Sequence, residues 1–327
     1  SYTMSNVTVE QVEAKLKEFV DPYIESDLVS AKLVKNIAVD GTRASVDIEL
    51  GFPHKGYQQE LTEKLTELLN DIDGIDDVQI NLDSKIVVHA VQKGVQPIQG
   101  VKNIIAVASG KGGVGKSTTT VNLALALAAE GARVAVLDAD IYGPSMPRML
   151  GITGKPESAD GQSLEPMLNY GLQTMSIGFL IDEETPMIWR GPMVTQALEQ
   201  LFKDTKWKDV DYLVVDLPPG TGDVQLTLAQ KIPVSGAVIV TTPQDIALLD
   251  ARKGLKMFDK VNVPVLGVVE NMSIHICSNC GHEERIFGEG GGQRMSTEEN
   301  VSFLGALPLD MSCLLYTSPS PRDCKVD

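Results

Sequence analysis

A glycine-rich segment at residues 110–117 constrains the fold more than any other part of this chain. It reads Gly-Lys-Gly-Gly-Val-Gly-Lys-Ser and matches the pattern G-x-x-x-x-G-K-[ST] in full. An apolar run (104–108) precedes it and a helical pattern (118–130) follows, which is the strand–loop–helix context that such a loop requires. Glycines let the backbone wrap around phosphate oxygens, and the N-terminus of the following helix adds positive partial charge. The segment predicts a nucleotide site on an α/β scaffold; the alternative is a glycine-rich turn that binds nothing.

The residues after position 100 predict a mostly parallel, doubly wound sheet. Continuous apolar runs are typical of strands that are buried on both faces, and here they alternate with helical patterns. Asp245 is expected to cap the last of these helices. Strands are predicted over 104–108, 134–137, 212–215, 237–241 and 265–269, and helices over 118–130, 194–202 and 246–261.

The first part of the chain predicts a small α+β domain over residues 1–93. Helical spacing is present over 9–20 and 58–69. Strand-like runs lie at 33–39, 44–50, 78–82 and 86–91, the first two joined by an Asp40-Gly41 turn. Residues 94–101 then form a linker and 102–310 the α/β domain, whereas 311–327 has no helical period, resembles translated cloning sequence and is expected to be non-native.

Composition narrows the range of partners and locations. The chain has 327 residues, of which 28 are basic and 44 acidic, so its net charge is −16. That charge disfavours nucleic acid, whose binding depends on neutralising phosphates. No run approaches the roughly 18 apolar residues of a membrane span. Only four cysteines are present, which favours a reducing cytoplasm over a disulfide framework.

Two lysines lie in the glycine-rich loop. Lys116 is expected to reach the β- and γ-phosphates, and Ser117 to bind Mg²⁺. Lys111 either is a solvated lysine or contacts phosphate on the nucleotide of its own or a partner subunit. The residue spacing leaves both readings open.

Aspartates at the ends of predicted strands complete the expected site. Asp216 follows the run 212–215, where a phosphate-binding fold places a carboxylate on the magnesium side. Asp138 and Asp140 follow another strand, and ligand chemistry is expected at such strand ends. The alternative is that these aspartates cap the next helix. The turn-rich loop 217–223 is suited to sensing the γ-phosphate.

A CxxC pair, Cys277 and Cys280, places two thiolates close enough to share one metal. Two ligands do not close a tetrahedral site, but a homodimer would supply four, enough for Zn²⁺ or an iron–sulfur cluster. A redox pair and a pair with no chemical role are the remaining readings.

Several motifs together resemble a known family. Residues 111–118 resemble the deviant Walker A loop of the MinD/ParA/nitrogenase-iron-protein class of ATPases. The CxxC pair and the motifs at 138–145, 189–193, 216–223 and 270–273 look like those of the Mrp/ApbC iron–sulfur cluster carriers. Residues 8–91 are similar to the iron–sulfur assembly-associated domain often fused in front of that ATPase, although Gly-Phe-Pro-His stands at 51–54, where some relatives carry a cysteine.

The resemblance implies a slow, Mg²⁺-dependent ATPase that works as a homodimer and carries a labile [4Fe–4S] cluster from an assembly scaffold to apoproteins. Cys277 and Cys280 of each subunit would bind the cluster. A ParA/MinD-like regulatory ATPase and a zinc-stapled dimeric ATPase remain as alternatives. The implied catalytic residues are Lys111 (reaching across the dimer), Lys116, Asp140 (orienting water) and Asp216. The implied Mg²⁺ ligands are Ser117, Asp138 and Asp216. The residues implied to bind ATP are Gly110, Lys111, Gly112, Gly113, Val114, Gly115, Lys116, Ser117, Thr118 and Asn271 (at the adenine).

Overall fold

The computed structural model describes residues 6–180 and 191–310. The chain divides into two compact units. The first comprises the described residues up to Val87 together with Ala129–Gly131, and the second comprises the rest. The predictions for residues 311–327 and for the first part of the 189–193 motif lie outside the described residues.

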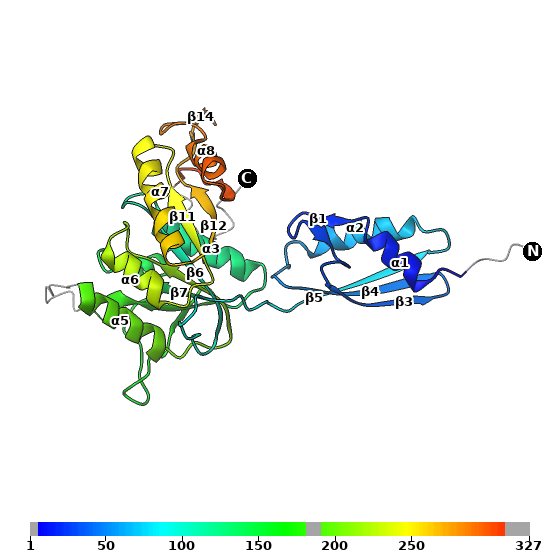
Figure 1. Ribbon diagram of the computed structural model, residues 1–327, viewed down its shortest axis with the longest axis horizontal. Helices are drawn as coiled ribbons and strands as arrows, with labels where there is room; N and C mark the ends of the chain where they lie inside the picture. Colours follow the sequence, from blue (N-terminus) through cyan, green and yellow to red (C-terminus); the bar gives the residue numbers. More distant parts are fainter. Residues whose placement is uncertain (1–5, 181–190, 311–327) are drawn as a thin grey trace, which may run out of the picture. The chain divides into compact units, whose positions relative to one another are not determined.

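The first unit is a three-stranded sheet with two helices on one face (Figure 1). Helix α2 connects strands β4 and β5 as a parallel crossover, and β3 pairs antiparallel with β4. Apolar residues alternate along β4, and this buried row packs against leucines of α2. The elements are α1 (Val9–Leu16), β1 (Val20–Asp21), β2 (Ser26–Asp27), β3 (Val34–Asp40), β4 (Arg43–Leu50), α2 (Gln58–Asn70) and β5 (Asp77–Ser84).

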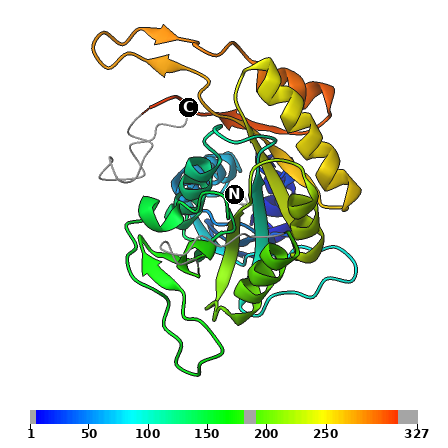
Figure 2. The same ribbon diagram turned by 90° about the vertical axis from the view of Figure 1, so that its left-hand side faces the viewer.

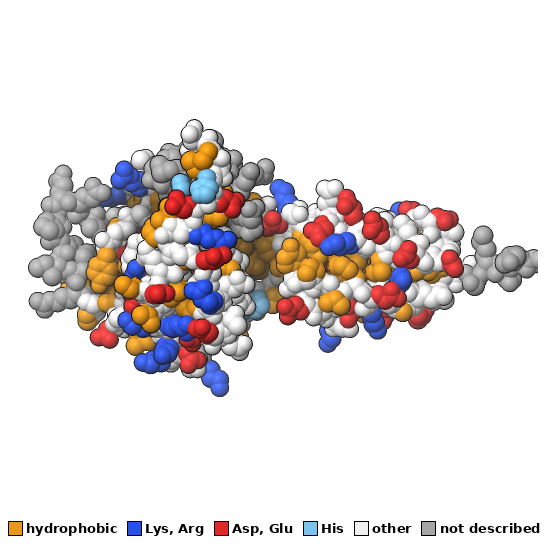
Figure 3. Space-filling model, turned by 90° about the horizontal axis from the view of Figure 1, so that it is seen from above, with side chains coloured by type: hydrophobic (Ala, Val, Ile, Leu, Met, Phe, Trp, Pro, Cys, Tyr) orange, Lys and Arg blue, Asp and Glu red, His pale blue; other side chains and the backbone are white. Residues whose placement is uncertain are grey.

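Two expectations for this unit are wrong. The strand expected over 86–91 does not form, because β4 ends at Leu50 and its ladder with β5 stops at Ser84; beyond it, Val87 N–H donates to Gly51 O outside any strand. The helix expected over 9–20 ends at Leu16, and Val20 already belongs to β1. Figure 3 shows apolar side chains on the surface of this unit, where Val20 and Tyr23 are 61% and 67% exposed.

The second unit confirms the predicted α/β architecture. Its eight-stranded sheet has the order β15-β12-β11-β6-β10-β7-β9-β8, and every pairing is parallel except that of β8 with β9. The strands are β6 (Val101–Ala108), β7 (Val134–Asp138), β8 (Met167–Asn169), β9 (Leu172–Ser176), β10 (Val210–Asp216), β11 (Gly236–Thr241), β12 (Val265–Glu270) and β15 (Phe303–Ala306).

Helices cover both faces of this sheet (Figure 2). One core layer packs α5, α6 and α7 against the sheet, and a second packs α3 and α4 against the other side of the same strands. Asp245 is not the cap of α7: Gln244 occupies that position, without a side-chain hydrogen bond to the helix. The helices are α3 (Lys116–Ala129), α4 (Met146–Met149), the 3₁₀ turn η1 (Ile177–Phe179), α5 (Gly191–Asp204), α6 (Asp223–Lys231), α7 (Asp245–Lys260) and α8 (Gly291–Glu298).

A small hairpin of strands β13 (His275–Ile276) and β14 (Glu283–Glu284) extends from this unit between β12 and α8. Within the described part of the chain, no helix has both the length and the apolar character needed to cross a membrane.

Candidate functional site

The glycine-rich loop joins β6 to α3 at the carboxyl end of the sheet. Gly113 and Gly115 adopt φ angles of 80° and 79°, a left-handed backbone that favours glycine. Gly110 is needed for a different reason: a Cβ there would lie 2.1 Å from the carbonyl carbon of Asp250 in α7. The loop is therefore fixed both by its own backbone geometry and by close packing against α7.

Lys116 begins α3 and points at the end of the neighbouring strand β10. Its Nζ lies 2.7 Å from Asp216 Oδ1 and 3.5 Å from Asp140 Oδ2, and the residue is only 6% exposed. Ser117 Oγ donates a 2.5 Å hydrogen bond to Asp216 Oδ2. The structure thus brings together four of the predicted residues. A serine hydroxyl beside a carboxylate is a donor set of hard oxygens that fits Mg²⁺.

Thr120 also belongs to this cluster, although the sequence reading missed it. Its Oγ1 donates to Asp216 Oδ1 at 2.9 Å. The available signal was its spacing: residues four apart on a helix share a face, so Thr120 follows Lys116 toward β10. Each oxygen of the fully buried Asp216 is therefore hydrogen-bonded by this part of the chain.

Asp138, at the end of β7, holds its own loop in place. Its Oδ2 accepts hydrogen bonds from the backbone N–H groups of Ser145 and Met146, where α4 begins, and from Ser176 Oγ. Burial, and then the charge of Asp216, raise the pKa of Asp138 to about 7. The contacts are those of a helix cap, which was the alternative reading, and a role in binding Mg²⁺ stays a prediction.

Asp140 contacts both Asp138 and Lys116. Its N–H donates to Asp138 Oδ1, and its own Oδ1 accepts from Tyr142 N–H. Burial raises the pKa of Asp140, and the nearby Lys116 ammonium opposes that rise. Its Oδ2 faces Lys116, the lysine that is expected to bind phosphate, and a role of Asp140 in orienting water stays a prediction.

Lys111 is partly exposed on the loop. Its carbonyl accepts a hydrogen bond from Ser109 Oγ, and no described carboxylate lies within 4.0 Å of its ammonium group. Gly220 N–H donates to Ser109 O at 2.9 Å, which places the 217–223 loop directly beside the phosphate-binding loop. Contact between Lys111 and a nucleotide phosphate stays a prediction.

Asn271 follows β12 and contacts the phosphate-binding loop. Its Nδ2 donates to Val114 O at 3.0 Å, and its backbone N–H donates to Thr241 O. Contact with an adenine ring stays a prediction. The preceding residue, Glu270, belongs to the 270–273 motif but had no predicted role: it is 1% exposed and accepts from Gly292 N–H at the start of α8.

The two cysteines lie at the tip of the β13–β14 hairpin, apart from the acidic cluster. Cys277 N–H donates to His282 O and Gly281 N–H donates to Cys277 O, which folds the segment into a tight turn. Both thiols are free, and Cys280 is exposed. Hydrogen bonds from the N–H groups of Asn279 and Cys280, and from the Cys280 thiol, lower the pKa of Cys277. Lowered thiol pKa values favour the thiolate, which is the form that binds metals.

No group of three or more potential metal ligands occurs among the described residues. The hairpin therefore presents two sulfur ligands and requires others from elsewhere to complete a four-ligand site.

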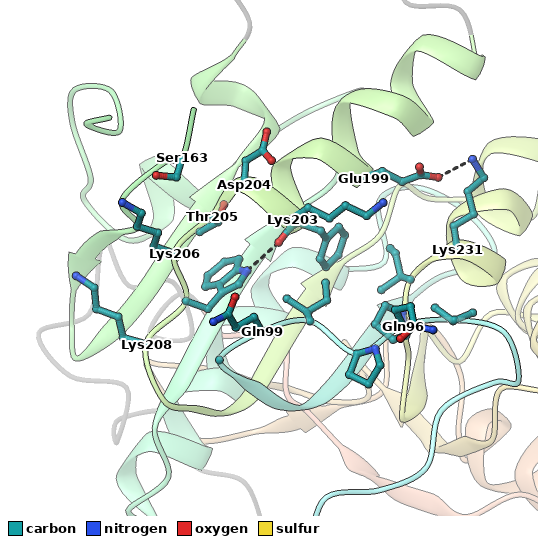
Figure 4. A pocket seen from close by; sticks show the side chains of 18 of the residues that line it. Gln96, Gln99, Ser163, Glu199, Lys203, Asp204, Thr205, Lys206, Lys208 and Lys231 are labelled. Atoms are coloured by element: carbon teal, nitrogen blue, oxygen red, sulfur yellow. Dashed lines mark hydrogen bonds and ion pairs between the residues drawn. The ribbon is translucent and has the colours of Figure 1, made fainter. Parts of the chain in front are cut away.

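A cavity of about 1360 Å³ lies at the opposite end of the sheet, where β6 and β10 begin. Lysines and acidic residues line it, among them Glu199 and Lys231, which pair at 2.5 Å (Figure 4). Trp207 donates its ring N–H to Phe202 O in its wall. None of the predicted site residues lines this cavity, so it is separate from the nucleotide site.

The phosphate-binding loop, its lysine and the strand-end acids define a P-loop NTPase on a mostly parallel sheet. A family model described as "NUBPL iron-transfer P-loop NTPase" matches residues 100–319, and the chain belongs to that family. A second model, described as "Iron-sulfur cluster assembly protein", matches residues 9–82. The family predicted from the sequence motifs is thereby confirmed.

Relatives cover most of the chain. It is 52% identical to the iron–sulfur cluster carrier protein of Escherichia coli K12, over 92% of this chain and 82% of the relative. It is 56% identical to the mouse iron–sulfur cluster transfer protein NUBPL, over 66% of this chain and 69% of the relative. A nucleotide-binding protein of Archaeoglobus fulgidus, solved with ADP, superposes with a TM-score of 0.59 at 39% identity, over 66% of this chain and 85% of that one.

Proposed function

We propose that this protein is an ATP-dependent iron–sulfur cluster carrier. It binds ATP with Mg²⁺, hydrolyses the nucleotide slowly, holds a labile [4Fe–4S] cluster between two copies of the chain and transfers that cluster to apoproteins. One observation carries the proposal: a single unit holds both a complete phosphate-binding loop and two free thiols on a hairpin. Free thiols favour the reducing cytoplasm as its location.

The nucleotide half of the proposal rests on the Lys116–Asp216 pair. The Lys116 ammonium lies within ion-pair distance of two carboxylates, those of Asp216 and Asp140. Nucleotide phosphates would attract Lys116 and leave Ser117 and Asp216 to hold Mg²⁺, which supplies charge neutralisation at the phosphate oxygens when bound. We assign the orientation of water to Asp140, and contact with the nucleotide of the second copy to Lys111.

The cluster half of the proposal rests on the exposed hairpin. Two thiolates from each of two copies give the four ligands of a [4Fe–4S] cluster. Ile276, which precedes Cys277 in the chain, and Ile286, which follows β14, are 48% and 51% exposed, and these apolar side chains on the hairpin segment suit an approaching second hairpin. A cluster held on an exposed tip is accessible to an apoprotein, which suits transfer.

The test is anaerobic reconstitution with iron and sulfide. Wild type is compared with Cys277→Ser/Cys280→Ser, and Cys313→Ser/Cys324→Ser is the matched control that removes the other two cysteines. We expect about four irons and four acid-labile sulfides per two chains for wild type and control, and none for the Cys277/Cys280 variant.

Two results would contradict the proposal. Cluster retention by the Cys277/Cys280 variant would show that other ligands hold it. Selective binding of zinc, with no labile sulfide, would favour the zinc-stapled ATPase, because the same two thiolates per chain suit tetrahedral Zn²⁺.

A further inference from the structure

Residues 270–277 connect the phosphate-binding loop to the cysteines by a short path. Asn271 contacts the loop, and Cys277 begins the turn that holds the thiols only six residues later. We infer that this segment, the 270–277 connector, transmits nucleotide occupancy of the loop to the geometry of Cys277 and Cys280, with Asn271 as the positioning residue. The inference rests on the proposed function and specifies how its two halves communicate.

The connector is closely fitted to the loop at its first end. Asn271 is 9% exposed, and its Nδ2 donates to Val114 O at 3.0 Å. A Cβ on Gly115 would lie 2.1 Å from that same Nδ2, so the loop backbone and the asparagine amide are in direct contact. A shift of the loop on binding phosphate therefore has to move Asn271 or break its hydrogen bond.

The middle of the connector is held by hydrogen bonds on both sides. Ser273 Oγ donates to Glu270 Oε1 at 2.8 Å, and Ser273 N–H donates to Leu307 O at 3.0 Å. Glu270 Oε2 accepts from Gly292 N–H at 2.5 Å. Met272 adopts a φ of 55°, a left-handed backbone that a non-glycine residue keeps only where its surroundings hold it. A segment held in this way passes on displacement instead of absorbing it.

The far end of the connector is the cysteine hairpin. Ile274 O accepts from Leu309 N–H, and the pairs His275–Glu284 and Ile276–Glu283 close the short ladder that leads to the turn. The thiols lie at the tip of this hairpin, with Cys280 exposed. A rotation imposed at Asn271 therefore changes where the hairpin presents its sulfurs.

The experiment measures thiol reactivity in the cluster-free chain. Iodoacetamide alkylation rates at Cys277 and Cys280 are resolved by peptide mass spectrometry, without nucleotide and with saturating Mg²⁺-ADP. Nucleotide binding is measured separately for every variant by calorimetry. The variants are Asn271→Ala and Met272→Gly; the second keeps the asparagine contact but frees the backbone behind it.

Asn169→Ala is the matched control. Asn169 Nδ2 also donates to a backbone carbonyl, that of Leu150, at 2.6 Å. It lies in β8, at the edge of the sheet opposite β15. Asn169→Ala removes the same kind of hydrogen bond in the same unit and leaves the 270–277 connector unchanged.

We expect ADP to change the wild-type and Asn169→Ala alkylation rates by about fivefold or more, the lower end of usual coupling between sites. In Asn271→Ala and Met272→Gly, each measured at the ADP concentration that calorimetry shows to saturate it, the change should fall to about twofold or less. An equal ADP effect in all four proteins, or no effect in wild type with ADP bound, would overturn the inference. A wild-type chain that binds no nucleotide would instead overturn the proposed function.

Discussion

At the scale of single residues, Tyr57 fixes the interior of the first unit. Its hydroxyl donates to Asp21 Oδ2 at 3.0 Å, and Asp21 is fully buried. Tyr57→Phe should lower the free energy of unfolding of this unit by about 1–3 kcal/mol, because a buried acceptor loses its donor. Scanning calorimetry of the full chain measures this, and Tyr23→Phe, at a residue that is 67% exposed, is the control.

The same hydroxyl predicts a dependence on pH. Burial and the bond to Asp21 raise the pKa of Tyr57 above its usual value of 10. Above about pH 10 the folded unit therefore keeps a proton that the unfolded chain has lost, and stability falls as the pH rises. This fall should be shallower in Tyr57→Phe than in wild type or Tyr23→Phe. Parallel pH profiles for all three proteins would refute the assignment.

Lys116 and Lys111 have different surroundings and should differ when substituted. Lys116→Ala should weaken ADP binding by about tenfold to a hundredfold, as the loss of a charged hydrogen bond predicts. It should also destabilise the second unit, because Asp216 is left buried without its cation. Lys111→Ala should leave ADP affinity within about threefold of wild type but slow hydrolysis, as expected for a lysine that acts across two subunits.

Titration calorimetry with Mg²⁺-ADP and assays of phosphate release separate these effects. Equal losses of ADP affinity in the two variants would mean that both lysines bind the nucleotide of their own chain.

At the scale of elements, packing between the loop and α7 gives a sharp steric test. Gly110→Ala places a methyl group 2.1 Å from the backbone of Asp250, so loop and helix must separate. Overpacking of this kind should cost about 1–3 kcal/mol of stability. In Gly112→Ala the nearest atom is Pro219 Cγ at 4.0 Å, and stability should change by no more than about 0.5 kcal/mol.

Urea titration followed by fluorescence reports on this unit, because Trp207 is 5% exposed within its core. Comparable losses in the two variants would show that flexibility of the loop backbone, and not contact with α7, determines the cost.

The central strands could be predicted because burial on both faces leaves a continuous apolar run, as in β11, where all six residues are buried. Strands β8 and β9 could not, since the three residues of β8 are partly exposed and the 167–176 segment has no such run. The four-residue α4 is too short for any period to show. The prediction of a strand over 86–91 was wrong for a different reason. These residues have the composition of a strand, but whether a strand forms also depends on a partner strand that is distant in sequence.

In the candidate site, too, local features could be predicted from the sequence and contacts across the fold could not. Spacing along the chain identified Lys116 and Ser117, because the loop motif itself fixes their geometry. Contacts across the fold remained hidden, such as Thr120 on Asp216 or the amide of Asn271 on Val114 O. Capping of the next helix was an open alternative for Asp138, but nothing local favoured it over a magnesium ligand, since its donors at the start of α4 are seven and eight residues further along the chain.

At the scale of the whole molecule, the chain combines two units with separate hydrophobic cores, and only the second carries both the loop and the thiols. A [4Fe–4S] cluster needs four ligands, and the described residues of one chain offer two cysteines. The number of chains per cluster therefore tests the proposed arrangement more directly than iron content does.

Co-expression of an untagged wild-type chain with a tagged Cys277→Ser/Cys280→Ser chain, followed by native mass spectrometry after reconstitution, gives that number. Clusters should occur on pairs of untagged chains and on no mixed pair, because a mixed pair supplies only two thiolates. A tagged Cys313→Ser/Cys324→Ser chain should form loaded mixed pairs freely, which shows that the tag does not prevent pairing. A cluster on a single wild-type chain would refute the shared site, since one chain would then complete the ligand set from residues other than its CxxC pair.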